Sequence, residues 1–324
     1  MDIDPYENDP ARWAHSLAHL SEILLPCLDT AGARSVVEVG AFAGDLTQVL
    51  LEWAAVSGAR ISAIDPTPHE TLVQLAEARD DLELVRETSL VALQHIPVPD
   101  AVIIDGDHNY YTVAEELRAI AARGDGATLP LLLIHDVCWP HGRRDNYFEP
   151  ERIPAESRHE IAEGGGLVPG EPGVRPGGLP YKAAAAREGG PRNGVLTAVE
   201  DFVAGREGLQ LAVVPVFFGL GVVWDRGAPW SGAMEELLRP WDGNALLARL
   251  EENRAHHLAH WYLQTSKTYQ AEERAARQEA LLRRMLDSSA FRVAERLSRL
   301  RRRAGIGAGH EAVSRDAVRR VLGG

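Results

Sequence analysis

The stretch SVVEVGAFAG, residues 35–44, decides the fold that we predict for this chain. It opens with an apolar run typical of a buried strand, continues through Gly40 and Gly44, and leads into a helical pattern near Asp45. Glycine allows the backbone to turn tightly and to approach a ligand closely. A strand, a glycine-containing turn and a helix in this order predict a ligand-binding βα unit, although a purely structural βα turn has the same spacing.

Strand and helix patterns alternate along the following residues. Short apolar runs predict strands, and helical patterns lie between them; the strands are at 35–39, 60–64, 82–85, 101–104 and 131–134, and the helices are at 46–53, 70–78 and 113–122. A helix at 194–204 and two strands at 209–216 and 217–224 follow. This alternation is typical of a parallel sheet covered on both faces. We predict an α/β fold, a Rossmann-like, doubly wound, mostly parallel seven-stranded sheet with an antiparallel C-terminal hairpin and a long α-helical C-terminal extension.

Composition shifts divide the chain into regions. We expect a helical segment at 1–30, the sheet domain at 31–226 and the helical extension at 227–324. Inside the domain, residues 141–193 are dense in Gly and Pro and directly follow the fifth strand, which predicts a long substrate loop or lid at the ligand crevice. The C-terminal helices are expected to join copies of the chain into a homo-oligomer, and the arginine-rich stretch 292–303 could alternatively touch an anionic membrane surface.

The overall charge and the cysteines restrict the class of partner and the compartment. The 324 residues carry a formal net charge of -13, which argues against a nucleic-acid partner because phosphate contacts need a basic surface. Cys27 and Cys138 are far apart in the sequence, which is typical of a reducing compartment. The first residues lack the apolar region of a signal peptide, and no apolar run is long enough to span a bilayer. We expect a cytoplasmic protein without stable membrane insertion.

The glycine turn indicates which cofactor the sheet binds. A dinucleotide fingerprint needs glycine where this chain has Phe42, because pyrophosphate requires very close backbone approach. S-adenosyl-L-methionine has no phosphate, so Phe42 is compatible with it. Asp65 ends the second strand, where a carboxylate can bind ribose hydroxyls, and Glu38 is expected near the ammonium group of the methionine part. The predicted cofactor-binding residues are Glu38, Gly40, Ala41, Phe42, Gly44, Asp65, Asp105, Gly106 and Asp107.

Acidic and histidine side chains follow the fourth and fifth strands. The fourth strand continues into DGDHNYY, residues 105–111, and the fifth into HDVCWP, residues 135–140. Both are C-terminal strand ends, which face the ligand crevice of an α/β sheet. Charged residues directly after buried strands are costly unless they are paired or functional. We therefore expect the two clusters to meet beside the cofactor.

These motifs resemble a bacterial class I S-adenosylmethionine-dependent methyltransferase family, related to the catechol and macrolide-sugar O-methyltransferases. The resemblance covers about residues 35–224, and the Asp-Gly-Asp-His and His-Asp motifs are its most diagnostic part. It implies that Asp105 and the acidic side chains after the fifth strand hold Mg²⁺, which binds substrate hydroxyls. It also implies that His108 is the general base. A sugar hydroxyl needs such a base, and imidazole has a suitable pKa.

His135 departs from the family pattern, in which an acidic residue or Asp-Asn is usual. Mg²⁺ prefers oxygen ligands, whereas imidazole favours Mn, Fe or Zn. The metal candidates are Asp105, His135 and Asp136, with Mg or Mn as the possible ion. Other roles remain open. Without a metal, His135 is a second base or a substrate donor, or it is a structural histidine. Asp107 could instead cap the following helix.

The function that we predict is transfer of a methyl group to a hydroxyl of a sugar or other specialised metabolite. His108 and His135 are the catalytic candidates, and Arg143, Arg144 and Tyr110 are the substrate candidates. The two arginines could instead pin the long loop through an ion pair. Two other function classes remain open: a metal-dependent, hydroxylase-like oxidoreductase on the same fold, and a non-catalytic scaffold that binds S-adenosylmethionine.

Overall fold

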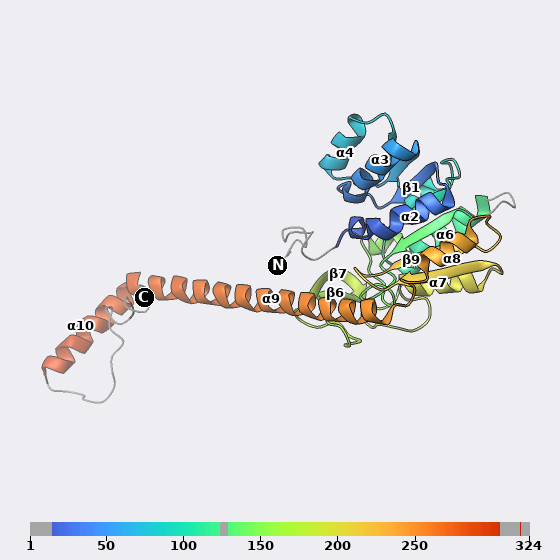
Figure 1. Cartoon of the computed structure of the whole chain (residues 1–324). Helices are drawn as coiled ribbons and strands as arrows, with labels where there is room; N and C mark the ends of the chain where they lie inside the picture. Colours follow the sequence, from blue (N-terminus) through green and yellow to red (C-terminus); the bar gives the residue numbers. More distant parts are fainter. Residues whose placement is uncertain (1–14, 124–128, 305–317, 319–324) are drawn as a thin grey trace. The chain divides into compact units, whose positions relative to one another are not determined.

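A seven-stranded sheet forms the centre of the fold (Figure 1). The computed structural model describes residues 15–123, 129–304 and 318, and it divides into two units, Met1–Tyr262 and Leu263–Gly324. The sheet lies in the first unit, in the order β3-β2-β1-β4-β5-β9-β8. Its strands are β1 (Ser35–Val39), β2 (Arg60–Ile64), β3 (Leu82–Val85), β4 (Ala101–Ile104), β5 (Leu131–His135), β8 (Leu209–Val214) and β9 (Leu220–Asp225).

The strand directions confirm the predicted fold class. The first five strands pair in parallel, whereas β9 pairs antiparallel with both β5 and β8. Every residue of β4 and β5 is buried, as expected for central strands covered on both faces. The carboxyl ends of β1, β4 and β5 are therefore neighbours at one edge of the sheet.

Helices cover both faces of the sheet, and each face has its own apolar core. One core contains side chains of α2 (Ser21–Ala31), α3 (Asp45–Ser57), α4 (Glu70–Glu77) and α8 (Ser231–Leu238). The other contains side chains of α5 (Ser89–Ala92), α6 (Tyr110–Arg123) and α7 (Val195–Ala204). Leu24 and Leu28 of α2 are fully buried, and the short helix η2 (Leu17–Leu20) precedes them. The described part of the predicted N-terminal segment is thus integral to the sheet domain.

The predicted long loop at 141–193 is wrong as a description of local structure. This segment contains an antiparallel hairpin of β6 (Ile161–Leu167) and β7 (Leu179–Ala185), preceded by the short helices η3 (Pro150–Arg152) and η4 (Ala155–Ser157). Glycines that normally weaken a strand allow close backbone approach here, because a Cβ on Gly166 would overlap the backbone of Gly177.

The helical extension begins inside the first unit. The 43-residue helix α9 (Ala245–Asp287) buries Leu258 and Tyr262 in a cluster with Leu179 and Phe218, so the first unit reaches Tyr262 and not residue 226. The second unit contains the remainder of α9 and the helix α10 (Ser289–Arg303). Among the described residues, no helix has both the length and the apolar character needed to cross a membrane.

Candidate active site

The glycine turn after β1 lies directly against the end of β4. Gly40 has a φ of 85°, and a Cβ at this position would overlap the carbonyl oxygen of Asp105. The Gly40 amide donates to the carbonyl of Ile64 at 2.9 Å, which fixes the turn to β2 as well. Glycine is thus required here for close packing of neighbouring strands. The predicted cofactor turn and the predicted chemical cluster are therefore in contact.

Asp65 forms hydrogen bonds at the other side of the turn. Its carboxylate accepts the backbone amides of Phe42 and Thr67, each at 2.8 Å. Phe42 has a φ of 40°, an unusual conformation for a side-chain-bearing residue, and its ring is 42% exposed. A carboxylate has about four lone-pair sites, so two remain for ribose hydroxyls.

Glu38 is a buried carboxyl group beneath the turn. The Thr47 hydroxyl of α3 donates to it at 2.6 Å. Burial raises the pKa of Glu38 to about 8, with Asp105 among the like charges that add to the effect. Ala41 of the turn is buried, and Gly44 lies against Leu72. A cationic ammonium group bound nearby would favour the ionised form of Glu38.

His135 is fixed by two hydrogen-bond acceptors. Its Nδ1 lies 2.9 Å from Asp105 Oδ1, and its Nε2 lies 2.9 Å from the carbonyl oxygen of Phe217. A ring that donates from both nitrogens carries two protons and a positive charge. Burial opposes this charge, but Asp105 and Asp136 raise the pKa of His135 to about 10. His135 is therefore cationic at neutral pH and does not accept a proton in this arrangement.

His108 faces the same carboxylates. Its Nε2 lies 3.2 Å from Asp136 Oδ2 and 3.6 Å from Asp105 Oδ1. Against the effect of burial, Asp136 and Asp105 raise the pKa of His108 to about 9. Asp136 has a φ of 59°, so the chain leaves β5 in a left-handed conformation at this carboxylate. The ring of Phe148 lies edge-on to His108 at 5.7 Å, and Phe148 is 58% exposed.

His141 and Tyr181 complete the cluster, and neither was predicted. The His141 ring lies 4.6 Å from the His108 ring, and its Nε2 lies 3.1 Å from the hydroxyl of Tyr181 on β7. Burial lowers the pKa of His141 to about 3, so this ring is neutral. His141 follows β5 by six residues, a weak signal. Nothing in the sequence indicated that Tyr181 would fold back onto the cluster.

The donor atoms of this cluster can converge on a cation. Two sets of three residues each have donor atoms within 4.8 Å of one another. One set is Asp105, His135 and Asp136, and the other is His108, Asp136 and His141. The hydrogen bond between His135 and the carbonyl of Phe217 is the type that orients a metal-ligating imidazole. A mixed nitrogen and oxygen donor set fits a first-row transition ion such as Mn²⁺ better than Mg²⁺, which prefers oxygen alone.

Asp107 and Asn109 organise the chain between the cluster and α6. Asn109 Oδ1 accepts the amide of Thr112 at 2.8 Å, so Asn109 caps the helix. Asp107 instead accepts the Thr112 hydroxyl at 3.0 Å and the Phe148 amide at 3.3 Å. Asp107 thereby holds Phe148 beside His108, and Gly106 packs on Val39 and Gly40.

The predicted substrate residues lie outside this cluster. Arg143 forms a bidentate ion pair with Glu200 of α7 at 2.6 and 2.7 Å. Arg144 is only 1% exposed and donates to the carbonyls of Ala185 and Pro172 at 2.6 and 2.8 Å. These contacts match the alternative role, pinning of the 141–193 segment. The Tyr110 hydroxyl donates to Asp201 at 2.8 Å.

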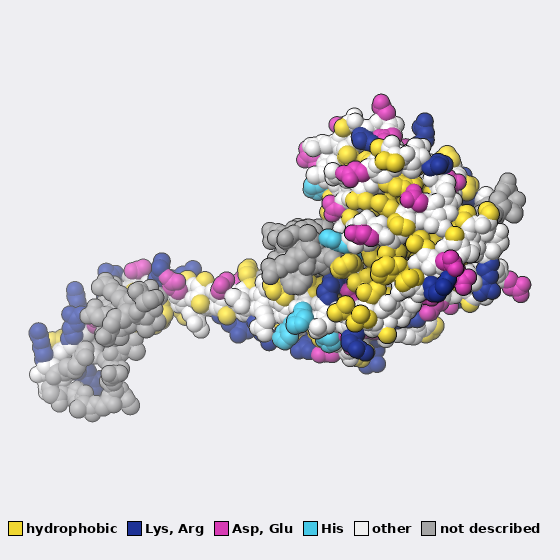
Figure 2. Space-filling model, viewed as in Figure 1, with side chains coloured by type: hydrophobic (Ala, Val, Ile, Leu, Met, Phe, Trp, Pro, Cys, Tyr) yellow, Lys and Arg dark blue, Asp and Glu magenta, His cyan; other side chains and the backbone are white. Residues whose placement is uncertain are grey.

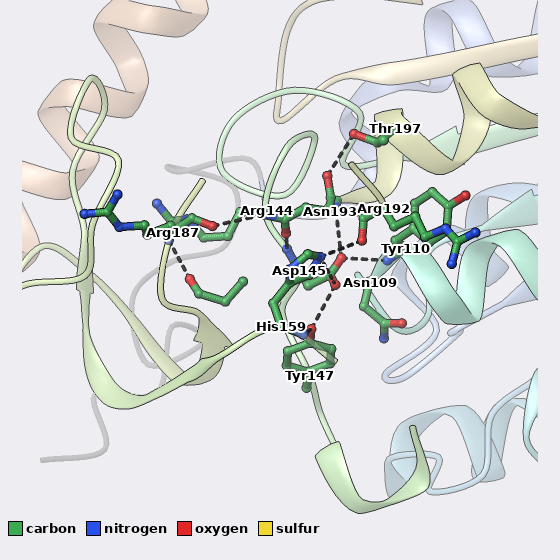
Figure 3. Close-up of polar contacts among 12 residues, drawn as sticks. Asn109, Tyr110, Arg144, Asp145, Tyr147, His159, Arg187, Arg192, Asn193 and Thr197 are labelled. Atoms are coloured by element: carbon green, nitrogen blue, oxygen red, sulfur yellow. Dashed lines mark hydrogen bonds and ion pairs between the residues drawn. The ribbon is translucent and has the colours of Figure 1, made fainter. Parts of the chain in front are cut away.

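Asp145, a fully buried carboxylate, also anchors the 141–193 segment (Figure 3). Asp145 accepts the amides of Tyr110 and Gly194, both at 2.7 Å, and the hydroxyl of Tyr147 at 2.9 Å. These amides belong to the starts of α6 and α7, where helix dipoles favour a negative charge. Asn193 accepts the Asp145 amide at 2.8 Å. Asp145 therefore fixes the segment that carries His141 and Phe148 to two helices of the sheet domain.

Comparison with known proteins agrees with this geometry. Residues 37–137, from β1 to the end of β5, match the family model of a methyltransferase domain. The chain contains a methyltransferase domain. The matched residues include the glycine turn, Asp65 and most of the histidine and carboxylate cluster. The predicted methyltransferase is thus confirmed. A search of curated proteins finds no match.

The solved structures that the chain resembles are methyltransferases, at low sequence identity and low TM-score. The Podospora anserina methyltransferase bound to S-adenosylhomocysteine is 15% identical, with a TM-score of 0.38 over 62% of this chain and 76% of that one. An O-methyltransferase family protein from Burkholderia thailandensis is 14% identical, with a TM-score of 0.39 over 67% of this chain and 62% of that one. An O-methyltransferase from neocarzinostatin biosynthesis, solved with S-adenosylmethionine and a naphthoic acid, is 15% identical, with a TM-score of 0.37 over 68% and 59%.

Proposed function

We propose that the domain transfers the methyl group of S-adenosylmethionine to a hydroxyl of a small acceptor, a sugar or another specialised metabolite. The observation that carries this proposal is the contact between the Gly40 turn and Asp105. It brings the predicted cofactor turn next to a cluster that can handle a proton. The cofactor would lie between Glu38 and Asp65, with Gly106 beside it.

In the proposed reaction the acceptor oxygen attacks the methyl carbon in line with the carbon–sulfur bond. That bond breaks, its electron pair stays on sulfur, and S-adenosylhomocysteine is released. His108 would take the hydroxyl proton. Its Nδ1 is buried and has no hydrogen-bond partner among the residues that the structure describes, so an acceptor hydroxyl that enters the cluster could supply one. Positioning of the two reactants would supply much of the rate enhancement.

The ionisation of His108 sets a condition on this role. With a pKa of about 9, the ring is mostly protonated at neutral pH. A divalent cation held by Asp105, His135 and Asp136 would take the place of the Nδ1 proton of His135, and it would offset the carboxylate charges that favour the proton on His108. When bound, such an ion lowers the pKa of an acceptor hydroxyl. We therefore propose Mn²⁺ or a similar ion as an assisting cofactor.

Replacement of His108 by Asn tests the assignment. Formation of S-adenosylhomocysteine is measured with a panel of hydroxylated sugars and phenols, and cofactor affinity is measured by calorimetry. We expect the variant to bind the cofactor as wild type does, and its turnover to fall about 10²–10⁴-fold, as for loss of a general base. Glu77→Ala, an exposed change at the end of α4, is the control and should keep full turnover. Unchanged turnover in His108→Asn would contradict the proposed base.

A second candidate function has one observation in its favour. His108, Asp136 and His141 form a two-histidine, one-carboxylate set, which is the ligand set of many non-haem iron oxygenases. Such an enzyme would consume oxygen when loaded with Fe²⁺ and an acceptor. Oxygen uptake without formation of S-adenosylhomocysteine would favour the oxidoreductase, and the reverse result favours the methyltransferase.

The predicted homo-oligomer remains a prediction. A truncation that tests it should end at Tyr262, since Leu258 and Tyr262 belong to the core of the first unit. We expect full-length protein to have a larger mass in solution than a monomer, and the truncated chain to be monomeric. A monomeric full-length chain would contradict the prediction.

A further inference from the structure

The helix α10 in the second unit has two distinct faces. Val293, Leu297 and Leu300 are 56%, 56% and 61% exposed. At about 100° per residue these positions lie within an arc of about 60° on the helix surface. Phe291 and Glu295, on the other side, are partly buried. The exposed apolar stripe is therefore separate from the face that packs within the unit.

Arginines lie along the border of this stripe. Arg292, Arg296, Arg299 and Arg303 follow the same helical spacing, about a quarter turn from Val293, and all four are exposed. Residues 289–303 contain six arginines and one glutamate, a net charge of +5 in a chain of net charge -13. Figure 2 shows Lys and Arg side chains gathered at the α10 end of this unit. A local net positive charge thus lies beside an exposed apolar stripe.

We propose that α10 binds reversibly, lying flat, to an anionic lipid surface. A narrow apolar stripe with arginine beside it is the pattern of an interfacial helix, whose apolar side chains enter the headgroup boundary while cations meet lipid phosphates. Antiparallel pairing of the stripe with that of a second copy is disfavoured, because it would place two rows of arginines on the same side of the interface. One such helix without a second anchor gives reversible association and no insertion. Lipid binding by α10 does not depend on the proposed methyl transfer.

Vesicle co-sedimentation of the full-length chain tests this proposal. The vesicles are phosphatidylcholine alone, or phosphatidylcholine with about one third phosphatidylglycerol at about 0.1 M salt. We expect binding only to the anionic vesicles, weakening as salt increases. The double variant Arg292→Gln/Arg296→Gln should partition about 30-fold more weakly, since each arginine contributes about fivefold. Leu297→Ser/Leu300→Ser should lose about tenfold or more.

Matched changes on α9 serve as controls. Leu281→Ser removes a leucine that is 60% exposed, and Arg274→Gln/Arg277→Gln removes the same charge from exposed positions. Both should bind anionic vesicles within about twofold of wild type. Cofactor binding, measured on every variant, reports the first unit separately.

Three results would overturn the proposal. They are equal binding to both kinds of vesicle, equal loss in the α9 and α10 variants, and no vesicle binding together with a solution mass that falls in Leu297→Ser/Leu300→Ser. The last result would assign the stripe to contact between two copies of the chain.

Discussion

Replacement of Asp145 by Ala should strongly destabilise the first unit. The carboxylate is fully buried and accepts two backbone amides at 2.7 Å and one hydroxyl at 2.9 Å. Its removal leaves the amides of Tyr110 and Gly194 without an acceptor, at about 1–3 kcal/mol each. Burial raises the pKa of Asp145, so the substitution also removes a desolvation penalty. We estimate a net loss of about 3 kcal/mol in the free energy of unfolding.

Urea and thermal unfolding measure this loss. A change of about 3 kcal/mol corresponds to a decrease in Tm of about 6–12 °C for a unit of this size. Asp145→Asn keeps an acceptor and should lose about 1 kcal/mol. Asp201→Ala is the matched control, because Asp201 contacts the same Tyr110 from an exposed position; it should lose about 0.5 kcal/mol or less. Equal stabilities of Asp145→Ala and Asp201→Ala would refute the reasoning.

Three further predictions concern ionisation, the cofactor and the metal. Burial raises the pKa of Glu116 to about 8, so between about pH 4.5 and 8 the folded chain keeps a proton on this carboxyl group that the unfolded chain has lost. The contribution of Glu116 to the free energy of unfolding therefore falls as pH rises through this range. Glu116→Gln should flatten that part of a urea-unfolding pH series, and an unchanged slope would argue against the buried proton. Asp65→Ala should weaken S-adenosylmethionine binding about tenfold or more in calorimetry, by loss of the ribose acceptor and of the Phe42 hydrogen bond; equal affinity would exclude the ribose role. Chelation should lower turnover, Mn²⁺ should restore it better than Mg²⁺, and His135→Ala should abolish the Mn²⁺ effect; metal-independent turnover would remove the proposed ion.

The sheet was predictable because its strands are defined by local composition. Continuous apolar runs such as 101–104 and 131–134 are typical of strands that are buried on both faces of a sheet. Parallel pairing of these two strands then places Asp105 beside His135. The glycine turn was predictable for the same reason, since Gly40 precedes a clear helix. The meeting of the two motifs thus followed from topology alone.

The 141–193 segment was not predictable, because its structure depends on long-range contacts. Glycines that signal a loop instead allow β6 and β7 to approach other backbone closely. Arg144 lies in the segment after β5, and the sequence does not distinguish an arginine that binds a ligand from one that donates to two carbonyls. Tyr181 reaches His141 only because that hairpin folds back. Sequence periodicity contains none of this information.

Calorimetric titration of the full-length chain with S-adenosylmethionine and S-adenosylhomocysteine tests the central claim most directly. The account predicts one site per chain, binding well below millimolar concentration, and marked weakening in Asp65→Ala. Absence of binding for both compounds at millimolar concentration would contradict the account, because the Gly40 turn would then have no methyl donor to place beside Asp105 and His108.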